Sequence, residues 1–335
     1  MMPWALYALA VSATVAPRFD TGVASFRAND CATALAEFDA SDKAGEKAPE
    51  LPVYRGICLA KTGEWEHAAD LLRPWTASHP DEARGWYWLA QAELYRKRFT
   101  EARDAIIHAI VNDQSSANAY RTLGQIELEL KSYDEAYRAW IKANKLNPRD
   151  ARTAYYLGRL FFEAEFLDEA AVWLRRSLAL DPHHFAAMTY LAMCAERLNM
   201  QDTATQLYVN AIRESKEQRT PFAWAFLNYG KLLRQSGRDQ EALAIFEEGE
   251  KLCPEAHLLT ALGQMLASAD HTERAVQVLR RATEMDPSIP DAHYRLALLY
   301  RLSGRTDEAQ VETRRFQDTK AAEERDKVKI QAIRK

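Results

Sequence analysis

The sequence is poor in residues that interrupt helices, and it has no strong excess of charge of either sign. Of its 335 residues, 12 are glycine and 12 are proline, whereas 47% are hydrophobic and 27% are charged. This composition favours an all-helical chain. The net charge of −4 at pH 7 gives no overall attraction to nucleic acid or to an anionic membrane, which argues against both as partners.

Motifs that carry catalysis or bind metal ions are also missing. The sequence contains no G-x-S-x-G, no glycine-rich phosphate-binding loop and no H-E-x-x-H. The four cysteines, Cys31, Cys58, Cys194 and Cys253, form no C-x-x-C pair, which argues against a zinc or thioredoxin-like site. We therefore expect no catalytic residues, no metal site, no cofactor and no small-molecule substrate.

What the chain does contain is two ladders of small residues. The spacings of the first ladder are 34, 34, 34, 34, 34, 38, 33 and 34 residues, and its members are Ala34, Ala68, Ala102, Ala136, Ala170, Ala204, Ala242, Ala275 and Ala309. The second ladder lies twelve residues earlier and consists of Gly22, Gly56, Ala90, Gly124, Gly158, Ala192, Gly230, Gly263 and Ala297. A fixed period of this length is typical of a solenoid, whose repeats bury their apolar faces against their neighbours. Two small positions in each repeat predict two helices in close contact.

Nine repeats follow from this period. We place their first residues at Val15, Pro49, Ala83, Ala117, Ala151, Phe185, Ala223, Ala256 and Pro290. In each repeat, apolar residues recur at helical spacing over about a dozen positions, stop at a polar or glycine turn, and recur again. We predict a helical hairpin for each repeat and an all-α superhelix over residues 15–316, followed by a charged helical extension at 317–335.

The repeats resemble the tetratricopeptide repeat (TPR), whose hairpin carries a W-x2-L-G-x2-Y helix, a central alanine and a closing proline. The fourth repeat shows the pattern best, with Tyr120, Leu123, Gly124, Ala136, Trp140, Ala143 and Pro148 in phase. Thr21 and Arg55 replace the usual leucine in the first two repeats, and Trp75 occupies a position that is normally small. The resemblance implies an α-α superhelix (TPR solenoid) with atypical packing at its N-terminal end.

The spacing of 38 residues between Ala204 and Ala242 marks an insertion near residues 215–221. We interpret the insertion as a lengthened surface loop, because such loops cost little stability. A change of superhelical direction between two sub-arrays is the alternative.

The resemblance also implies a concave groove, which in similar proteins is lined by the first helix of each hairpin. The corresponding residues here are Arg84, Tyr87, Gln91, Tyr95, Asn118, Arg121, Gln125, Arg152, Tyr155, Arg159, Phe162, Trp224, Lys231 and Arg234, with Asn228 one step off the pattern. Aromatic rings interleaved with Arg, Asn and Gln suit an extended peptide, because the rings supply contact area and the polar groups bind its backbone or carboxylates.

The predicted function is therefore that of a non-catalytic scaffold for protein–protein interaction, which binds a protein or peptide in the groove. A regulatory or substrate-recruiting subunit of an enzyme complex is the alternative. The same residues are also compatible with an ordinary solvated helix surface, since Arg and Gln are common on any helix.

Two cysteines fall on stretches that antiparallel stacking makes neighbours. Cys31 opens the second helix of the first repeat, and Cys58 lies late in the first helix of the second repeat. A disulfide between them would close a loop of about 28 residues and contribute about 3–4 kcal/mol on the loop-entropy model. Two buried free thiols are the alternative, as we expect for Cys194 and Cys253.

The first 17 residues contain no charged side chain and are mostly apolar. Small residues near the end of this stretch favour a secretory signal peptide at residues 1–16, which is too short for a good membrane span. We expect a mature chain that begins near residues 14–17 and is exported, to the periplasm or the cell exterior. A cytoplasmic protein with an apolar cap helix and a membrane-anchored protein remain alternatives.

Overall fold

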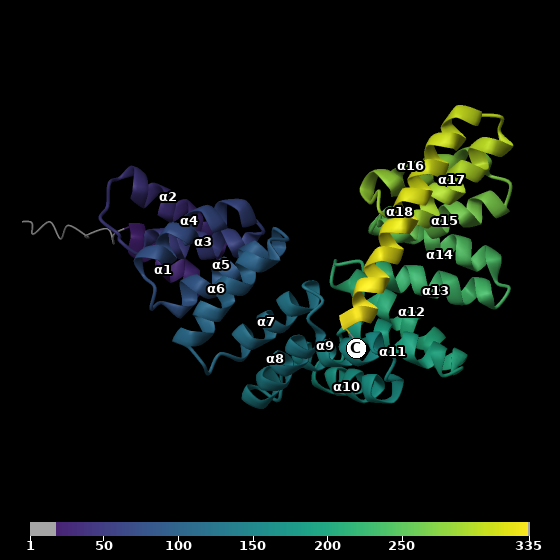
Figure 1. Cartoon of the computed structure of the whole chain (residues 1–335). Helices are drawn as coiled ribbons and strands as arrows, with labels where there is room; N and C mark the ends of the chain where they lie inside the picture. Colours follow the sequence, from purple (N-terminus) through teal and green to yellow (C-terminus); the bar gives the residue numbers. More distant parts are fainter. Residues whose placement is uncertain (1–17, 334–335) are drawn as a thin grey trace, which may run out of the picture. The chain divides into compact units, whose positions relative to one another are not determined.

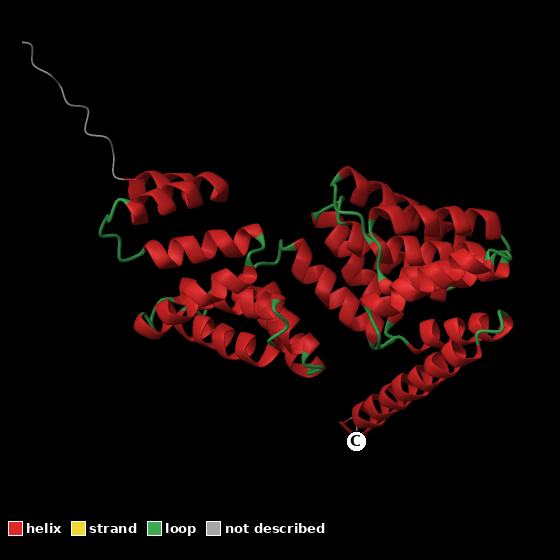
Figure 2. Ribbon diagram, turned by 90° about the horizontal axis from the view of Figure 1, so that it is seen from above, coloured by secondary structure: helices red, strands yellow, loops and turns green. Residues whose placement is uncertain are grey.

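The computed structural model describes residues 18–333, with side chains described through Ala322 and at Glu324. Within this range the chain is helical and contains no strand (Figure 2). The helices of the described residues are α1 (Arg18–Arg27), α2 (Cys31–Lys43), α3 (Leu51–Thr62), α4 (Trp65–Ser78), α5 (Ala83–Tyr95), α6 (Phe99–Asn112), α7 (Ala117–Glu129), α8 (Tyr133–Leu146), α9 (Ala151–Glu163), α10 (Leu167–Leu180), α11 (Phe185–Arg197), α12 (Gln201–Glu217), α13 (Ala223–Gln235), α14 (Asp239–Leu252), α15 (Ala256–Ser268), α16 (Thr272–Met285), α17 (Pro290–Leu302) and α18 (Thr306–Ile333).

The described residues divide into two compact units, residues 18–148 and residues 149–333. The first unit contains α1–α8 and the second contains α9–α18. In each unit every odd-numbered helix packs against the even-numbered helix that follows it, and successive hairpins stack side by side (Figure 1). The prediction of an all-α fold built from antiparallel helical hairpins is confirmed. Below, the odd-numbered helix of a hairpin is called its first helix and the even-numbered one its second helix.

The small residues of both ladders lie where the two helices of a hairpin cross. The alanines of the first ladder are at most 5% exposed. Each glycine of the second ladder faces the side chain sixteen residues later. A Cβ built on Gly158 would lie 2.6 Å from Leu174 Cγ, and one built on Gly230 would lie 2.6 Å from Phe246 Cζ. Because no larger side chain fits in this space, the pairing of a small residue with a large one fixes the close approach of the two helices.

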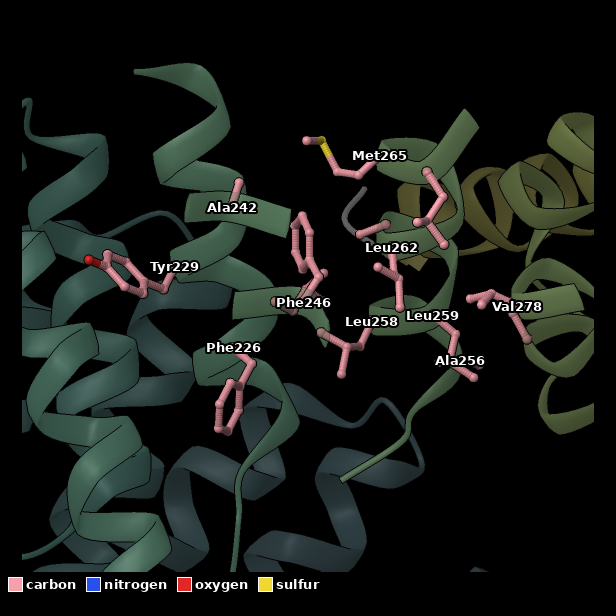
Figure 3. Packing of buried hydrophobic residues seen from close by; sticks show 14 of the residues in the cluster. Phe226, Tyr229, Ala242, Phe246, Ala256, Leu258, Leu259, Leu262, Met265 and Val278 are labelled. Atoms are coloured by element: carbon pink, nitrogen blue, oxygen red, sulfur yellow. The ribbon is translucent and has the colours of Figure 1, made fainter. Parts of the chain in front are cut away.

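Neighbouring hairpins share a continuous core, as the second unit illustrates. Phe226 from α13, Phe246 from α14, and Leu258 and Leu262 from α15 meet in the space between their helices (Figure 3). All four side chains are at most 1% exposed. Each hairpin therefore buries its apolar face against the next one, which is how a solenoid repeat is stabilised.

The turn inside each hairpin contains one residue with left-handed backbone geometry. These residues recur with the same spacing as the alanine ladder, and they are Asn29, Gly63, Lys97, Lys131, Glu165, Asn199, Gly237, Asp270 and Gly304. Only three of them are glycine, so in the other hairpins a residue with a side chain adopts a conformation that costs roughly 1–2 kcal/mol. The sequence did not reveal this third ladder, because its members share a conformation and not a residue type.

Replacing Lys97 by glycine should therefore stabilise the protein. Lys97 has φ of 60°. Relief of left-handed strain should exceed the extra backbone entropy that glycine loses on folding, which leaves a net gain of about 0.5–1 kcal/mol. Urea denaturation followed by circular dichroism measures the change. Lys97→Ala is the control and should give no gain. An equal gain from alanine would assign the effect to the lysine side chain instead of to the backbone.

The insertion between Ala204 and Ala242 lengthens mainly a helix, and the predicted surface loop is limited to residues 218–222. Helix α12 has 17 residues, whereas α10 and α14 on either side have 14 each. The longer end of α12 is held by a contact of 2.8 Å between His183 Nδ1 and Glu214 Oε2. Gln218 Nε2 also donates a hydrogen bond of 2.7 Å to the His183 carbonyl. The division between the compact units lies at residues 148–149 and not at this insertion.

The bulky Trp75 fits at a normally small position because the residue that faces it is a glycine. Its ring is 7% exposed, stacks on His79 at 3.6 Å and donates a hydrogen bond from Nε1 to Glu82 Oε2. The residue facing it on α5 is Gly85, where an added Cβ would lie 3.0 Å from Trp75 Cδ1. The large side chain of the second repeat is thus matched by a missing side chain in the third.

The array begins with a capped short helix, α1, and ends with a long helix, α18. At the N-terminal end, the Glu46 carboxylate accepts hydrogen bonds from the backbone N–H groups of Arg18 and Phe19, at 3.0 and 2.9 Å, and so caps α1. The predicted signal peptide at residues 1–16 lies outside the described residues.

At the C-terminal end, α18 continues through Ile333. No helix in the described range is both long and apolar enough to cross a membrane.

Candidate partner-binding surface

The predicted groove residues belong to first helices in both compact units. Those in the first unit lie on α5 and α7, and those in the second unit lie on α9 and α13. We describe each set by itself and refer to it as the first-helix face of its unit.

A pocket of about 270 Å³ lies on the first-helix face of the first unit. Three of the predicted residues line it, Arg84 and Tyr87 from α5 and Asn118 from α7. Asp113 and Ser116, from the turn between α6 and α7, complete its polar wall. The pocket therefore offers a guanidinium group, a carboxylate, an amide and a hydroxyl beside one aromatic ring.

Arg84 is held in place by its neighbours. Its Nε donates a hydrogen bond of 3.0 Å to Glu82 Oε1, and its guanidinium carbon lies 4.8 Å from the ring centroid of Tyr54. Such a cation–π contact orients the group and leaves part of it open to solvent, since 39% of the Arg84 side chain is exposed. Across the pocket, hydrogen bonds from the side chain and backbone of Ser115 keep the pKa of Asp113 below its usual value, so this carboxylate is charged at neutral pH.

Tyr87 and Gln91 are joined in a hydrogen-bond network that crosses from α5 to α7. Gln91 Nε2 lies 3.1 Å from the Tyr87 hydroxyl and 2.7 Å from Thr122 Oγ1, and it donates to both oxygens. Tyr87 and Gln91 are half-buried, as are Arg121 and Gln125 further along the face. Asn118 is exposed. The hydrogen bond to Thr122 therefore links α5 to α7 and holds the Gln91 side chain in place.

In the second unit the structure corrects the prediction for Tyr155. This ring is 9% exposed and lies among His184, Tyr156 and Tyr190, with centroid distances of 4.8, 5.1 and 5.8 Å. Burial raises the pKa of Tyr155 well above its usual value. Tyr155 is therefore part of the packing between α9 and α11 and does not present its ring to solvent.

Phe162 is also buried, at 5% exposure, under the guanidinium group of Arg197 at 5.0 Å. Arg159 is half-buried and lies 5.8 Å from the ring centroid of Tyr190. Of the predicted residues on α9, Arg152 is exposed. The aromatic contact area expected from Tyr155 and Phe162 is thus largely used within the protein.

Helix α13 contributes a more open part of the face. Trp224 is 40% exposed, and its ring centroid lies 6.2 Å from that of His257. Asn228 Nδ2 donates a hydrogen bond of 2.8 Å to the Trp224 carbonyl. Lys231 is exposed, although partial desolvation by the neighbouring helices lowers its pKa against the opposing effect of the Glu196 carboxylate. This region combines an accessible indole ring with an accessible ammonium group.

Several residues of these faces were missed from the sequence. Tyr54 supports Arg84, Thr122 accepts the hydrogen bond of Gln91, and Tyr190 packs against Tyr155. None of them occupies a groove position of the repeat pattern. They act from the adjacent helix, so only the packing of neighbouring hairpins identifies them.

A larger cavity, of about 740 Å³, lies between α16, α17 and α18. At its lining, His293 Nδ1 lies 2.6 Å from Glu312 Oε2, and His293 Nε2 lies 3.0 Å from the Pro287 carbonyl. Glu312 Oε1 accepts a further hydrogen bond of 2.9 Å from Arg315. These contacts engage both ring nitrogens and both carboxylate oxygens, so the pair links α17 to α18. In the part of the chain that the structure describes, no group of three or more His, Cys, Asp or Glu side chains could hold a metal ion.

Comparison with protein families gives a clear match. The family model described as "Tetratricopeptide repeat" matches residues 55–119, 89–145, 121–185 and 260–313. Together these matches extend over residues 55–185 and 260–313, which is more than half of the chain. No curated protein matches the sequence.

Solved structures match the fold at low sequence identity. The Cut9–Hcn1 heterotetramer of the APC/C aligns with a TM-score of 0.62 and 18% identity over 80% of this chain and 52% of that chain. Yeast Tom70 aligns with a TM-score of 0.62 and 17% identity over 85% and 60%. A tetratricopeptide repeat protein from Parabacteroides merdae aligns with a TM-score of 0.53 and 14% identity over 84% and 97%. The chain thus spans about half of the matched Cut9–Hcn1 chain and three-fifths of Tom70, and these likenesses concern the fold alone.

Proposed function

Since the chain belongs to the tetratricopeptide repeat family, we propose that its first-helix faces bind an extended segment of a partner protein. The family's fold commonly mediates protein–protein interaction, and it typically serves as a scaffold without catalytic activity. The Cut9–Hcn1 heterotetramer is one example in which a chain of similar fold assembles with another protein.

The observation that carries the proposal is the pocket of about 270 Å³ between α5 and α7. Its lining combines the chemistry that peptide recognition needs. Arg84 can donate to a carboxylate or a backbone carbonyl, Asn118 can both donate to and accept from a peptide unit, and the Tyr87 ring supplies apolar contact area. Because Arg84 is already oriented by Glu82 and Tyr54, binding loses less side-chain entropy there than at a mobile arginine.

The second unit adds an anchor of a different kind. Trp224 is a large exposed aromatic residue, and tryptophan is among the residues most often found at the energetic centre of an interface. Asn228 fixes the backbone beneath it, and Lys231 lies two helical turns further along the same helix. We propose that this part of the face contacts an apolar side chain flanked by an acidic group.

Replacing Arg84 and Asn118 together by alanine should weaken peptide binding by roughly 10- to 100-fold, because two donors at the pocket are lost. Peptides selected from a phage-displayed library of random dodecapeptides on the immobilised full-length chain provide the probe. Fluorescence polarisation of the selected peptides then gives the dissociation constants of both proteins. Tyr155 is unsuitable for this test, since removing its buried ring would change the packing of α9 and α11.

Arg138→Ala is the matched control. Arg138 lies on α8, a second helix of the same unit, and 72% of its side chain is exposed. This variant should bind the selected peptides like the wild type. Thermal melts should show that both variants keep their fold. If the double variant binds every selected peptide with unchanged affinity, the pocket is not the binding site.

The alternative function is that of a regulatory or substrate-recruiting subunit of an enzyme complex. Such a subunit would use the same surface as a scaffold, and the two functions differ only in whether the bound partner belongs to an enzyme. Matching the selected peptides to the proteins of the native cell distinguishes the two. A match to the segment of an enzyme would favour the regulatory role, whereas matches to non-enzymatic proteins would favour a scaffold.

A further inference from the structure

The thiol groups of Cys31 and Cys58 lie together in the core of the first unit. Cys31 is the first residue of α2, and Cys58 lies in α3, the helix that packs against α2 (Figure 1). Lys61 Nζ, near the end of α3, donates a hydrogen bond of 2.9 Å to Asn29 Oδ1 just before α2, so the late part of α3 lies beside the start of α2. Both cysteines belong to the same buried cluster, and neither is part of a disulfide. The stacking of two hairpins thus brings together two thiols that are 27 positions apart in the sequence.

The two thiols differ in accessibility. Cys58 is fully buried, whereas Cys31 is 7% exposed at the edge of the core. Burial raises the pKa of Cys58 well above its usual value, and the neighbouring Cys31 thiol acts in the same direction. The charged neighbours of Cys58 are Lys61, whose ammonium group favours a thiolate, and Asp30, whose carboxylate opposes it. A reagent from solvent therefore meets Cys31 first, and Cys58 reacts with whatever Cys31 has become.

We propose that Cys31 and Cys58 form a redox-sensitive dithiol site, which glutathione disulfide oxidises to an intramolecular disulfide that joins the first two hairpins. The proposal rests on the packing of α2 against α3, and it does not depend on the partner-binding surface.

The chemistry is thiol–disulfide exchange in two steps. The Cys31 thiolate attacks one sulfur of glutathione disulfide, which forms a mixed disulfide on Cys31 and releases one glutathione thiolate. Cys58 then loses its proton and attacks the Cys31 sulfur, which forms the Cys31–Cys58 bond and releases the second glutathione as a thiolate that takes up this proton. The protein loses two thiol hydrogens and is oxidised by two electrons, and glutathione disulfide is reduced to two glutathione molecules.

The bond would act where the repeat pattern is weakest. Thr21 and Arg55 depart from the usual leucine in the first two repeats, and Trp75 departs from the usual small residue. A link between α2 and α3 restrains the unfolded chain in this region, because it closes a loop of about 28 residues. Oxidation should therefore raise the unfolding midpoint of the first unit.

The other two cysteines serve as internal controls. Cys194 lies in α11 and is 1% exposed, and burial raises its pKa to about 11. Cys253 ends α14 at its C-cap, and burial raises its pKa to about 11 as well. Both should stay reduced under conditions that oxidise Cys31 and Cys58.

The experiment equilibrates the full-length chain in glutathione buffers that range from fully reduced to mostly oxidised, and then traps free thiols by alkylation. Peptide mapping without reductant should find one cross-linked pair, the peptides of Cys31 and Cys58, whose fraction rises with the oxidised share of the buffer. Oxidation should raise the midpoint of thermal unfolding by roughly 5–15 °C. In the Cys31→Ser variant, this shift should be absent.

Three outcomes would overturn the proposal. In one, Cys31 and Cys58 are both alkylated in the most oxidising buffer. In the second, glutathione remains attached to Cys31 and no cross-linked peptide forms. In the third, the Cys31→Ser variant shows the same rise in midpoint as the wild type. Cys58→Ala provides a second test if Cys31→Ser does not fold, because it leaves the more accessible thiol, Cys31, in place and should stop the reaction at the mixed disulfide.

Discussion

Replacing Trp140 by alanine should lower the free energy of unfolding by about 3–5 kcal/mol, the cost of removing a large buried aromatic side chain. Trp140 is 0% exposed, and its ring fills the space that Gly124 leaves open on α7. Its Nε1 also donates a hydrogen bond of 3.1 Å to the Arg121 carbonyl. The variant therefore creates a cavity between the two helices of the fourth hairpin and removes a hydrogen bond that joins them.

Urea denaturation followed by circular dichroism measures this loss without relying on tryptophan fluorescence. The matched control is Tyr133→Ala, which removes an aromatic ring from the same helix at a position that is 41% exposed. The control should change stability by at most about 0.5 kcal/mol. Equal effects of the two substitutions would show that the fourth hairpin is not held together by this contact.

Much of the fold follows from the sequence because one physical constraint repeats in every hairpin. Two helices approach closely only where one of them lacks a bulky side chain, so Gly124 and Gly158 mark the crossing points directly. The spacing of such residues then gives the number of hairpins and their order. Local turn geometry leaves no such record, since Asn29, Lys97 and Glu165 adopt the same left-handed conformation with different side chains.

The insertion shows a second limit of sequence reasoning. The stretch around residues 215–221 is polar, and polarity alone does not distinguish a loop from one more turn of an exposed helix. In the structure, Glu214 and Gln218 form side-chain contacts to His183, which lies before α11. These contacts hold the longer end of α12, and the sequence does not reveal them because they join positions more than thirty residues apart.

The orientation of side chains on the first-helix faces was predicted less well, and Tyr155 shows why. A residue at the edge of the first-helix face can turn toward solvent or toward the next hairpin. The choice depends on what the next hairpin offers, and here His184 and Tyr190 provide an aromatic site for the ring. Arg84 and Asn118 lie on the face as predicted, at a pocket. The repeat pattern places a position on a helix, but the side chains of the neighbouring helix decide which way it points.

The sequence predicts one property of Cys31 and Cys58, their proximity, but not another, their oxidation state. Their proximity was expected from antiparallel stacking, and the structure places both in the same buried cluster of the first unit. Their oxidation state depends on the redox potential of the surroundings, which no sequence contains. That is why the proposed bond is tested by equilibration with glutathione and not by geometry.

Replacing Gly158 by valine should destabilise the second unit by about 3 kcal/mol, at the upper end of the range for overpacking a core. The helices α9 and α10 cross at this glycine. A Cβ there would lie 2.6 Å from Leu174 Cγ and 3.1 Å from the backbone nitrogen of Leu174. The leucine side chain could rotate away, but the backbone nitrogen cannot move without shifting α10. The two helices must therefore separate, and contacts along the whole hairpin weaken.

Gly158→Ala separates this effect from ordinary helix propensity. Inside an unobstructed helix, replacing glycine by alanine raises stability by about 0.5–1 kcal/mol, so the sign of the change is informative. We expect a loss at Gly158. A double-mutant cycle with Leu174→Ala should then show strong coupling, because the shorter side chain makes room for the added methyl group. A gain in stability from Gly158→Ala, or additive effects in the cycle, would mean that the small residues of the second ladder do not set the distance between the helices.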